Sequence, residues 1–257
     1  MRVKGTLIMA NSDWLGLAGK RVLQIGAGGF GGAIAKGFID EGAHVYVVDQ
    51  LDISPILHSG DSSALCYEAR KISSKDDCDS VVKNAVGVLG GIDIFVYAIG
   101  VNNRVPITEI SVEDYRRIQL INTEICLWTA QALFPHIKNS GGKLVFFSSV
   151  SAFLAHPHHG AYAASKGAIT QLLKVMAIEW AEYGICVNAV APGYAITPLT
   201  QKHLEQGNHY EELVSKVPMG RLASIDDVVG PVLFLSSERS AYITGHTIVI
   251  DGGRMLD

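Results

Sequence analysis

The chain has 257 residues, of which 48% are hydrophobic and 18% are charged, and its formal net charge is −4. That length and hydrophobic content predict one globular domain with a large core, or at most two small ones. The mild acidity, without any run of lysines or arginines, argues against a nucleic-acid partner. Four widely spaced cysteines that form no C-x-x-C pair are typical of buried thiols in a reducing, cytoplasmic compartment: Cys66, Cys78, Cys126 and Cys186.

Residues 1–17 are expected to form a loosely held N-terminal arm ahead of a single domain that spans residues 18–257. The arm contains an apolar patch at residues 7–10. Because this patch is too short for a signal peptide or a membrane span, the sequence predicts no association with a membrane.

A glycine-rich loop ends the first apolar run of the domain. Gly26, Gly28 and Gly31 match the pattern G-x-G-x-x-G. Glycines let the backbone approach a pyrophosphate, which binds at the N-terminus of the following helix, where amides and the helix dipole favour an anion. The alternative, a flexible glycine linker, fits poorly between two apolar strands. The strand, helix and second strand of a dinucleotide-binding unit are all present: Lys20–Ile25, Ala33–Ile39 and Ala43–Asp49.

Asp49 ends that second strand, 18 residues after Gly31. A carboxylate at this place accepts hydrogen bonds from an adenosine ribose and repels a 2′-phosphate. The next three residues, 50–52, include no Arg or Lys that would bind the phosphate. The sequence therefore predicts NAD rather than NADP, with an ordinary turn-opening Asp as the alternative.

Strand and helix patterns alternate through the rest of the chain. The expected strands are Ala64–Tyr67, Ile92–Ala98, Lys143–Ser149, Ile185–Val190 and Thr247–Asp251. The expected helices are Lys75–Leu89, Ser111–Phe134 with a break near Asn122, a long helix over residues 160–183, and Ile225–Ser236. This alternation predicts the α/β class: a single-domain Rossmann fold, with a doubly wound parallel sheet of about seven strands and helices on both faces.

Tyr162 and Lys166 are four residues apart in the long helix, so they share one face of it. At about 4 Å and an effective dielectric near 20, an ammonium attracts a phenolate by roughly 4 kcal/mol. That energy would lower the phenol pKa by about three. Tyr162 is therefore expected to titrate nearer neutrality and to exchange protons. Exposed helices carry many Tyr-x-x-x-Lys pairs, so the neighbouring motifs decide whether this pair indicates a catalytic site.

Those motifs resemble the short-chain dehydrogenase/reductase family in its classical single-domain form. In the family's order they are Asn122, Ser149, Tyr162-x-x-x-Lys166, Pro192-Gly193 followed by Thr197, and Asp251-Gly252-Gly253. The resemblance extends over nearly the whole chain, from Leu17 to Gly253. Three places depart from the pattern: Ile25 replaces Thr before a glycine loop that is shorter by one residue, Tyr97-Ala98-Ile99-Gly100 replaces Asn-Asn-Ala-Gly, and Lys71 replaces an acid.

The resemblance implies a role for each member of the catalytic set. Tyr162 would exchange a proton with the substrate oxygen, and Lys166 would lower the pKa of Tyr162 and bind the nicotinamide ribose. Ser149 would donate a hydrogen bond to the substrate oxygen, and Asn122 would hold a water that links Lys166 to solvent. Two alternatives stay open: Ser149 as one member of a polar turn, and Asn122 as a helix-interior residue bonded to its own backbone.

The resemblance also implies an NAD site at the carboxyl ends of the strands, where open α/β sheets bind ligands. Thr197 and the backbone of Ile196 are expected to hold the nicotinamide amide, with a simple helix start at Thr197 as the alternative. The expected cofactor-binding residues are Gly26, Gly28, Gly29, Phe30, Gly31, Asp49, Gly100, Tyr162, Lys166, Pro192, Gly193, Ile196 and Thr197.

The segment His156-Pro157-His158-His159 has no carboxylate or cysteine within ten residues. The sequence therefore predicts no metal and assigns the segment to the substrate pocket. With a polar segment at residues 194–217, it favours a polyol, a sugar acid or a small hydroxy acid; polar loops that only face solvent are the alternative. The expected substrate-binding residues are Ser149, Tyr162, His156, His158, Asn102, Arg104 and Tyr194.

The sequence thus predicts an NAD(H)-dependent oxidoreductase that moves a hydride between nicotinamide and the alcohol or ketone carbon of a polar small molecule. One alternative is a 3-oxoacyl-thioester reductase of the same family. Another is a non-catalytic, dinucleotide-binding regulatory protein, which the altered glycine loop favours and the complete catalytic set opposes. Family members are commonly tetramers, so a homotetramer is expected.

Overall fold

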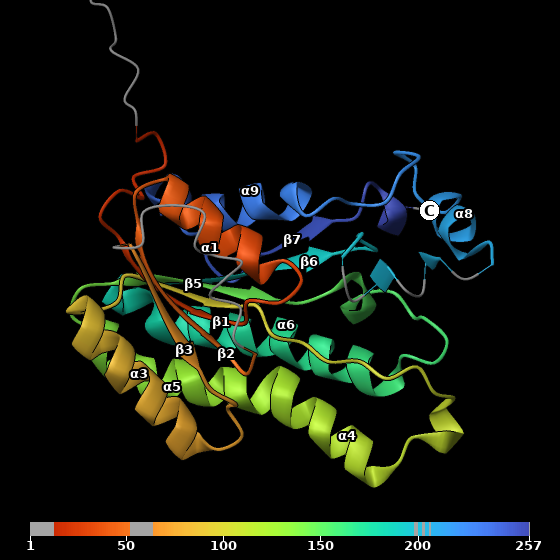
Figure 1. Cartoon of the computed structure of the whole chain (residues 1–257), viewed down its shortest axis with the longest axis horizontal. Coiled ribbons are helices and arrows are strands. Elements are labelled where there is room, and N and C mark those ends of the chain that lie inside the picture. The colour runs from red at the N-terminus through yellow and green to blue at the C-terminus, as the bar shows by residue number, and fades with distance from the viewer. Residues whose placement is uncertain (1–12, 52–63, 198–199, 202–203, 206, 257) are drawn as a thin grey trace, which may run out of the picture.

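Seven parallel strands form one sheet in the order β3-β2-β1-β4-β5-β6-β7 (Figure 1). The computed structural model describes residues 13–51, 64–197, 200–201, 204–205 and 207–256. The chain order reverses its direction across the sheet between β1 and β4, which is where open α/β sheets bind ligands. The strands are β1 (Arg21–Ile25), β2 (His44–Asp49), β3 (Leu65–Ala69), β4 (Ile94–Tyr97), β5 (Gly142–Phe147), β6 (Ile185–Pro192) and β7 (Thr247–Ile250).

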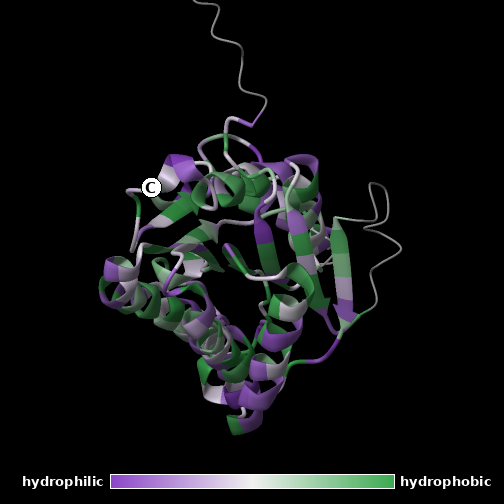
Figure 2. Ribbon diagram, turned by 90° about the vertical axis from the view of Figure 1, so that its left-hand side faces the viewer, coloured by the Kyte–Doolittle hydropathy of each residue, from purple (hydrophilic) through white to green (hydrophobic). Residues whose placement is uncertain are grey.

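Helices cover both faces of this sheet (Figure 1). Helices α1 (Gly31–Asp40) and α9 (Asp226–Leu235) lie on one face, and α3 (Lys75–Leu89), α5 (Ile125–Ile137) and α6 (Gly160–Trp180) lie on the other. Two buried apolar clusters, one on each side, hold the layers together. Figure 2 shows that the helices of both layers carry hydrophobic and hydrophilic residues along their length. The predicted α/β class and Rossmann architecture are confirmed.

Several helix ends differ from the expected bounds, and the largest differences are at the C-terminal ends of α5 and α6. Helix α5 continues past Phe134 and through Pro135 to Ile137, because Ile137 is 1% exposed and packs in the core. Pro135 lies inside the helix and removes one backbone donor there. Helix α6 ends at Trp180 and tightens into a 3₁₀ turn, which Gly184 closes with a φ of 69°.

The end of the predicted N-terminal arm packs against the domain. Leu17 is fully buried, and its amide donates to Asp13 Oδ1 at 2.8 Å. Residues 1–12 of the arm lie outside the described residues. Within the part of the chain that the structure describes, no helix combines the length and apolarity that crossing a bilayer requires.

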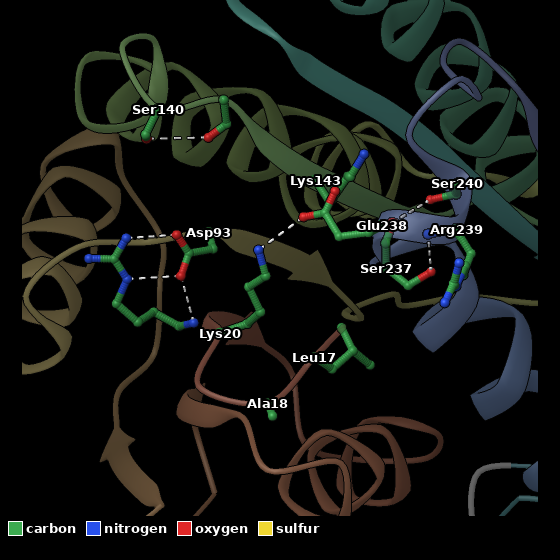
Figure 3. Close-up of polar contacts among 12 residues, drawn as sticks. Leu17, Ala18, Lys20, Asp93, Ser140, Lys143, Ser237, Glu238, Arg239 and Ser240 are labelled. Atoms are coloured by element: carbon green, nitrogen blue, oxygen red, sulfur yellow. Dashed lines mark hydrogen bonds and ion pairs between the residues drawn. The ribbon is translucent and has the colours of Figure 1, made fainter. Parts of the chain in front are cut away.

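Ion pairs join the elements at the amino ends of the strands (Figure 3). Arg21, which begins β1, binds Asp93 before β4 in two parallel contacts, Nη2 to Oδ1 at 2.7 Å and Nε to Oδ2 at 2.9 Å. Lys20 pairs with Glu238 after α9 at 3.0 Å. These contacts fix the edge of the sheet opposite the glycine loop and leave the carboxyl ends to the site.

Candidate active site

The loop between β1 and α1 excludes side chains at two glycines and leaves two others open. A Cβ on Gly31 would lie 2.3 Å from the Gly26 carbonyl oxygen, and one on Gly26 would lie 2.8 Å from Ile99 Cγ1. Gly28 and Gly29 have nothing within 4 Å of an added Cβ. No side chain caps the start of α1, and the Gly31 amide donates to the Gly28 carbonyl within the loop at 2.9 Å. The arrangement fits the pyrophosphate of a dinucleotide.

Gln24, a polar residue inside the apolar strand β1, ties the two ends of this loop together. Its fully buried amide nitrogen donates to the carbonyl oxygens of Gly26 at 2.8 Å and Gly31 at 2.7 Å. The glycine pattern does not point to Gln24. A lone polar residue between Leu23 and Ile25 is the sequence signal that does.

Asp49 ends β2 beside the same loop. Its Oδ2 accepts the Ala27 amide at 2.8 Å, and its Oδ1 accepts the Leu51 amide at 3.1 Å. The carboxylate therefore braces the glycine loop and also opens a turn, while each oxygen keeps a lone pair for a ribose hydroxyl. Arg70 donates its amide to the Asp49 carbonyl at 2.7 Å, but its guanidinium is paired with Glu68 at 2.6 Å.

Tyr162, Ser149 and Lys166 meet at the carboxyl end of β5. Helix α6 carries Tyr162 and Lys166 one turn apart, with the ammonium 5.7 Å from the centre of the phenol ring. The Ser149 side chain lies close enough to Tyr162 to lower the pKa of its phenol, and its hydroxyl accepts the Ser151 amide at 3.1 Å. Ser149 thus contacts its expected partner and also forms the polar turn of the alternative interpretation. Lys166 Nζ donates to the Phe147 carbonyl oxygen at 2.7 Å.

The expected lowering of the Tyr162 pKa by Lys166 is wrong. Burial raises the pKa of the Tyr162 phenol, and the hydrogen bond with Ser149 offsets part of that rise. Burial also lowers the pKa of Lys166 to about 8, so the ammonium is itself disfavoured. Because the lysine gives its hydrogen bond to Phe147, Ser149 is the neighbour that lowers the pKa of Tyr162.

Replacing Lys166 by Met should stabilise the folded protein near neutral pH. A pKa lowered from 10.5 to about 8 corresponds to about 3 kcal/mol against the charged form. Between these values the unfolded chain binds more protons here than the folded one, so the wild-type free energy of unfolding rises with pH. Below about pH 8 the folded wild type bears the full free-energy cost of holding the buried Lys166 ammonium. The stabilisation by Lys166→Met should therefore be greatest there and vanish above 10.5.

Urea unfolding of wild type and Lys166→Met across this pH range checks the expectation. Lys174→Met, on the exposed side of the same helix, is the matched control and should change little. A Lys166→Met variant less stable than wild type at neutral pH would show that the bond to Phe147 outweighs the cost of burial.

The expected break near Asn122 is a π-helical turn, Leu120–Glu124, between α4 (Val112–Gln119) and α5. Single π turns inside helices are frequent at functional sites. Asn122 is fully buried: its Oδ1 accepts the Val101 amide at 2.8 Å, and its Nδ2 donates to the Val101 carbonyl at 2.9 Å and the Ser165 hydroxyl at 2.8 Å. It joins the loop after β4 to α6, so the interpretation of Asn122 as bonded to its own backbone is wrong.

The segment after β6 gives a mixed result for the expected nicotinamide contacts. Pro192 ends β6 in the core, and Gly193 follows it. Thr197 is buried, and its hydroxyl accepts the Thr200 amide at 3.3 Å, as at a helix start. The side chain of Ile196 is 45% exposed. These contacts favour the helix-start interpretation of Thr197, while the cofactor contacts stay predictions.

A cavity of about 400 Å³ lies beside the Tyr162 cluster. Its walls come from the loops after β4, β5, β6 and β7, and from α8 (His209–Val214) with the turn that follows it. The cavity lies next to the cluster, since His159 lines it with its ring 6.2 Å from that of Tyr162, whereas the expected substrate-binding residues Ser149 and Tyr162 are not among its lining residues. Four of the expected substrate-binding residues line it: His156, His158, Arg104 and Tyr194.

Two more residues of the loop after β4 were expected in the site, Asn102 for the substrate and Gly100 for the cofactor, and neither lines the cavity. Asn102 is exposed and is not among the residues that line the cavity. Gly100 lies against Lys166, since a Cβ there would be 3.2 Å from its Nζ. A side chain at position 100 would therefore crowd the lysine.

The histidine segment is held by hydrogen bonds and ring contacts. His156 Nδ1 lies 3.2 Å from Ser151 Oγ, and its ring meets that of Tyr194 edge-on at 5.9 Å. His159 Nδ1 lies 2.9 Å from the Pro157 carbonyl oxygen. Burial lowers the pKa of both imidazoles, which favours their neutral forms. Among the described residues, no three His, Cys, Asp or Glu side chains gather where they could hold a metal.

Lys216 and Arg254 also line the cavity, and the motifs did not point to them. Arg254 lies four residues after β7, at the same edge of the sheet as the other loops. In a parallel sheet, any residue just after a strand is a candidate for the site. That rule would have found Arg254, whereas nothing local marks Lys216.

The sequence profile of the enoyl-(acyl carrier protein) reductase family matches residues 26–254. The chain is 31% identical over 254 residues to gluconate 5-dehydrogenase of Gluconobacter oxydans (strain 621H), covering 95% of this chain and 98% of that protein. It is 32% identical over 250 residues to glucose 1-dehydrogenase of the same strain, covering 93% of each.

Solved structures show the same architecture. A gluconate 5-dehydrogenase from Burkholderia cenocepacia J2315, in complex with NADP and tartrate, superposes with a TM-score of 0.90 at 28% identity, covering 96% of this chain and 99% of that one. The match extends over the glycine loop, the Tyr162 cluster and the strand-end loops alike. The chain therefore belongs to the classical short-chain dehydrogenase/reductase family, as an oxidoreductase that acts on alcohol groups with a nicotinamide dinucleotide.

Proposed function

We propose that the protein is an NAD(H)-dependent dehydrogenase of small polyhydroxylated compounds, a sugar, sugar acid or polyol. The observation that supports this most is the cluster at the carboxyl end of β5, where Ser149 lowers the pKa of Tyr162 and Lys166 lies one helical turn away, next to a cavity of about 400 Å³. Relatives named for gluconate and glucose favour this substrate class.

In the proposed oxidation, the Tyr162 phenolate takes the proton of the substrate hydroxyl. When bound, the nicotinamide accepts the hydride, so the alcohol becomes a ketone. Ser149 donates a hydrogen bond to the substrate oxygen, and removing such a donor costs about 2.7–4 kcal/mol in other enzymes. Lys166 binds the nicotinamide ribose, and Asn122 holds the water that links Lys166 to solvent. In the reverse direction Tyr162 returns the proton.

Incubation with NAD or NADP and a panel of sugars, aldonates and alditols tests this function by the appearance of reduced nicotinamide. Turnover of at least one polyhydroxylated compound is expected. Binding of a dinucleotide without any turnover would favour the non-catalytic alternative, whereas failure to bind either dinucleotide would favour an unrelated role. Exclusive reduction of 3-oxoacyl thioesters would favour the second candidate, which a relative named as a 3-oxoacyl-[acyl-carrier-protein] reductase, 33% identical over 246 residues, supports.

Asp49→Ala should raise the KM for NAD and lower the KM for NADP. The carboxylate at the end of β2 repels a 2′-phosphate, and Arg70 is engaged by Glu68. Because Asp49 also holds the Ala27 amide, the decrease in the KM for NADP should be smaller than the loss of repulsion alone would give. Asp40→Ala, at an exposed helix end, is the control. A wild type that prefers NADP, the cofactor in the Burkholderia structure, would contradict the proposed preference.

A cytoplasmic homotetramer is part of the same proposal. Helix α6 carries exposed apolar side chains, Val175 at 44% and Ile178 at 81%, which a second copy would cover. Multi-angle light scattering of the full chain measures the oligomeric state. A monomer at micromolar concentration would contradict the proposal.

A further inference from the structure

The cavity next to Tyr162 has a cationic wall. Lys216, Arg254 and Arg104 all line it, against the carboxylates of Glu212 and Asp251. Among the described residues, no carboxylate lies within ion-pair distance of Lys216 or Arg254. Two cations that line a concave space and form no ion pair with a described residue, in a lining where three positive charges exceed two negative ones, indicate an anionic ligand.

Arg254 is held in a fixed turn. Asp251 Oδ1 accepts the Gly253 amide at 2.9 Å, and its Oδ2 accepts the Met255 amide at 2.8 Å, so this carboxylate closes the turn that carries Arg254. The charge of Asp251 is thereby engaged by backbone donors. Arg254 is half-buried, which limits the solvent screening of its guanidinium.

Lys216 stands on a segment that packs against this same turn. The Met219 amide donates to the Gly252 carbonyl at 3.1 Å, and a Cβ on Gly252 would lie 2.7 Å from Val217 Cγ1. The two backbones therefore touch, although α8 and the C-terminal turn come from distant parts of the sequence. This contact places both cations on one wall of the cavity.

The opposite side of the cavity offers neutral polar groups. The pKa of His156 is lowered by burial and also by three nearby cations, Arg254, Lys216 and Arg104. His159 connects His156 to Tyr162, with ring centres 5.7 and 6.2 Å apart. The two imidazoles therefore form a chain of ring contacts from the lining of the cavity to the Tyr162 ring.

We propose that the substrate carries a carboxylate and that Lys216 and Arg254 bind it, which makes an aldonate or another polyhydroxy acid the substrate. This inference rests on the proposed dehydrogenase function. It narrows that function from sugars and polyols in general to their acids. Arginine suits this task, since its guanidinium binds a carboxylate with two parallel hydrogen bonds.

The experiment compares acid and neutral partners of the same carbon chain, D-gluconate with D-glucitol and D-galactonate with D-galactitol. It uses the full-length enzyme with its preferred dinucleotide. The variants are Lys216→Gln, Arg254→Gln, the double variant and the conservative Arg254→Lys, with Lys83→Gln on the exposed side of α3 as the matched loss of one positive charge. If the enzyme does not oxidise one compound of a pair, the inhibition constant of that compound as a competitive inhibitor is compared in place of its KM.

Wild type should prefer the acids. Each Gln variant should raise the KM for the acids by about tenfold or more, as expected for the loss of a charge-assisted hydrogen bond. For the alditols, the KM or inhibition constant of each Gln variant should stay within about twofold of the wild-type value, because no contact with these neutral compounds is lost. Arg254→Lys should recover part of the loss, and added salt should weaken the binding of the acids only.

Equal constants for acid and alditol in wild type would overturn the inference, as would Gln variants that behave like Lys83→Gln. Turnover of neutral sugars alone would leave the proposed function standing and remove the carboxylate site. Conversely, gluconate binding that depends on Lys216 and Arg254, without any turnover, would support the site and contradict the dehydrogenase.

Discussion

Replacing Tyr162 by Phe is expected to lower kcat/KM by about 10²- to 10⁴-fold, the range for removing a positioned acid/base group. The ring and its contact with His159 stay, so only the hydroxyl that Ser149 contacts is lost. Dinucleotide binding, followed by fluorescence titration, should be little changed. Tyr242→Phe removes a hydroxyl from a fully exposed ring and serves as the control. Turnover that survives Tyr162→Phe would remove the proton-transfer role.

The pH profile tests the same role through Ser149. Oxidation needs the ionised phenol, so kcat/KM rises as the pH passes through the pKa of Tyr162. Because the hydrogen bond with Ser149 lowers that pKa, Ser149→Ala should move the rise to higher pH. A shift to lower pH, or an unchanged midpoint with a lower plateau, would contradict this coupling.

Replacing Gly31 by Ala should abolish dinucleotide binding at concentrations that saturate the wild type. A Cβ at this position would lie 2.3 Å from the Gly26 carbonyl oxygen, so the backbone of the loop must move. Overpacking of this kind costs about 1–3 kcal/mol in stability, and the displaced amides would no longer face the pyrophosphate. Isothermal titration with NAD and thermal unfolding measure the two effects separately.

Two further glycine variants separate cofactor loss from misfolding. Gly28→Ala has room for its Cβ in the protein, yet places it in the cradle. It should weaken NAD binding and leave the unfolding temperature unchanged. Gly87→Ala lies in open space within α3 and should be neutral or stabilising by about 1 kcal/mol. Normal NAD binding by both Gly28→Ala and Gly31→Ala would contradict a pyrophosphate site at this loop.

Local patterns predicted the fold and the catalytic cluster well. The alternation of strands and helices required a parallel sheet, and a parallel sheet places Ser149 and the glycine loop at one edge. The four-residue spacing put Tyr162 and Lys166 on one helix face. These features depend on residues near one another in sequence, which is why the sequence alone could show them.

The electrostatics of the cluster depended on contacts that the sequence does not contain. Spacing alone could not show that Lys166 would be buried and bonded to Phe147, or that the burial of Tyr162 itself would raise the pKa of its phenol. Lys216 was missed for a similar reason, because it reaches the cavity through packing against the distant C-terminal turn.

The π turn at Leu120–Glu124 has a consequence for sequence length. Its hydrogen bonds span five residues instead of four, so this helix carries one residue more than regular α geometry needs. Deleting one residue there would let α4 and α5 merge into an unbroken helix with their apolar sides still aligned. Asn122 would lose its inward bulge and with it the bridge to Val101 and Ser165. A relative whose aligned sequence lacks one residue at this place is therefore expected to fold normally but to lack this part of the site.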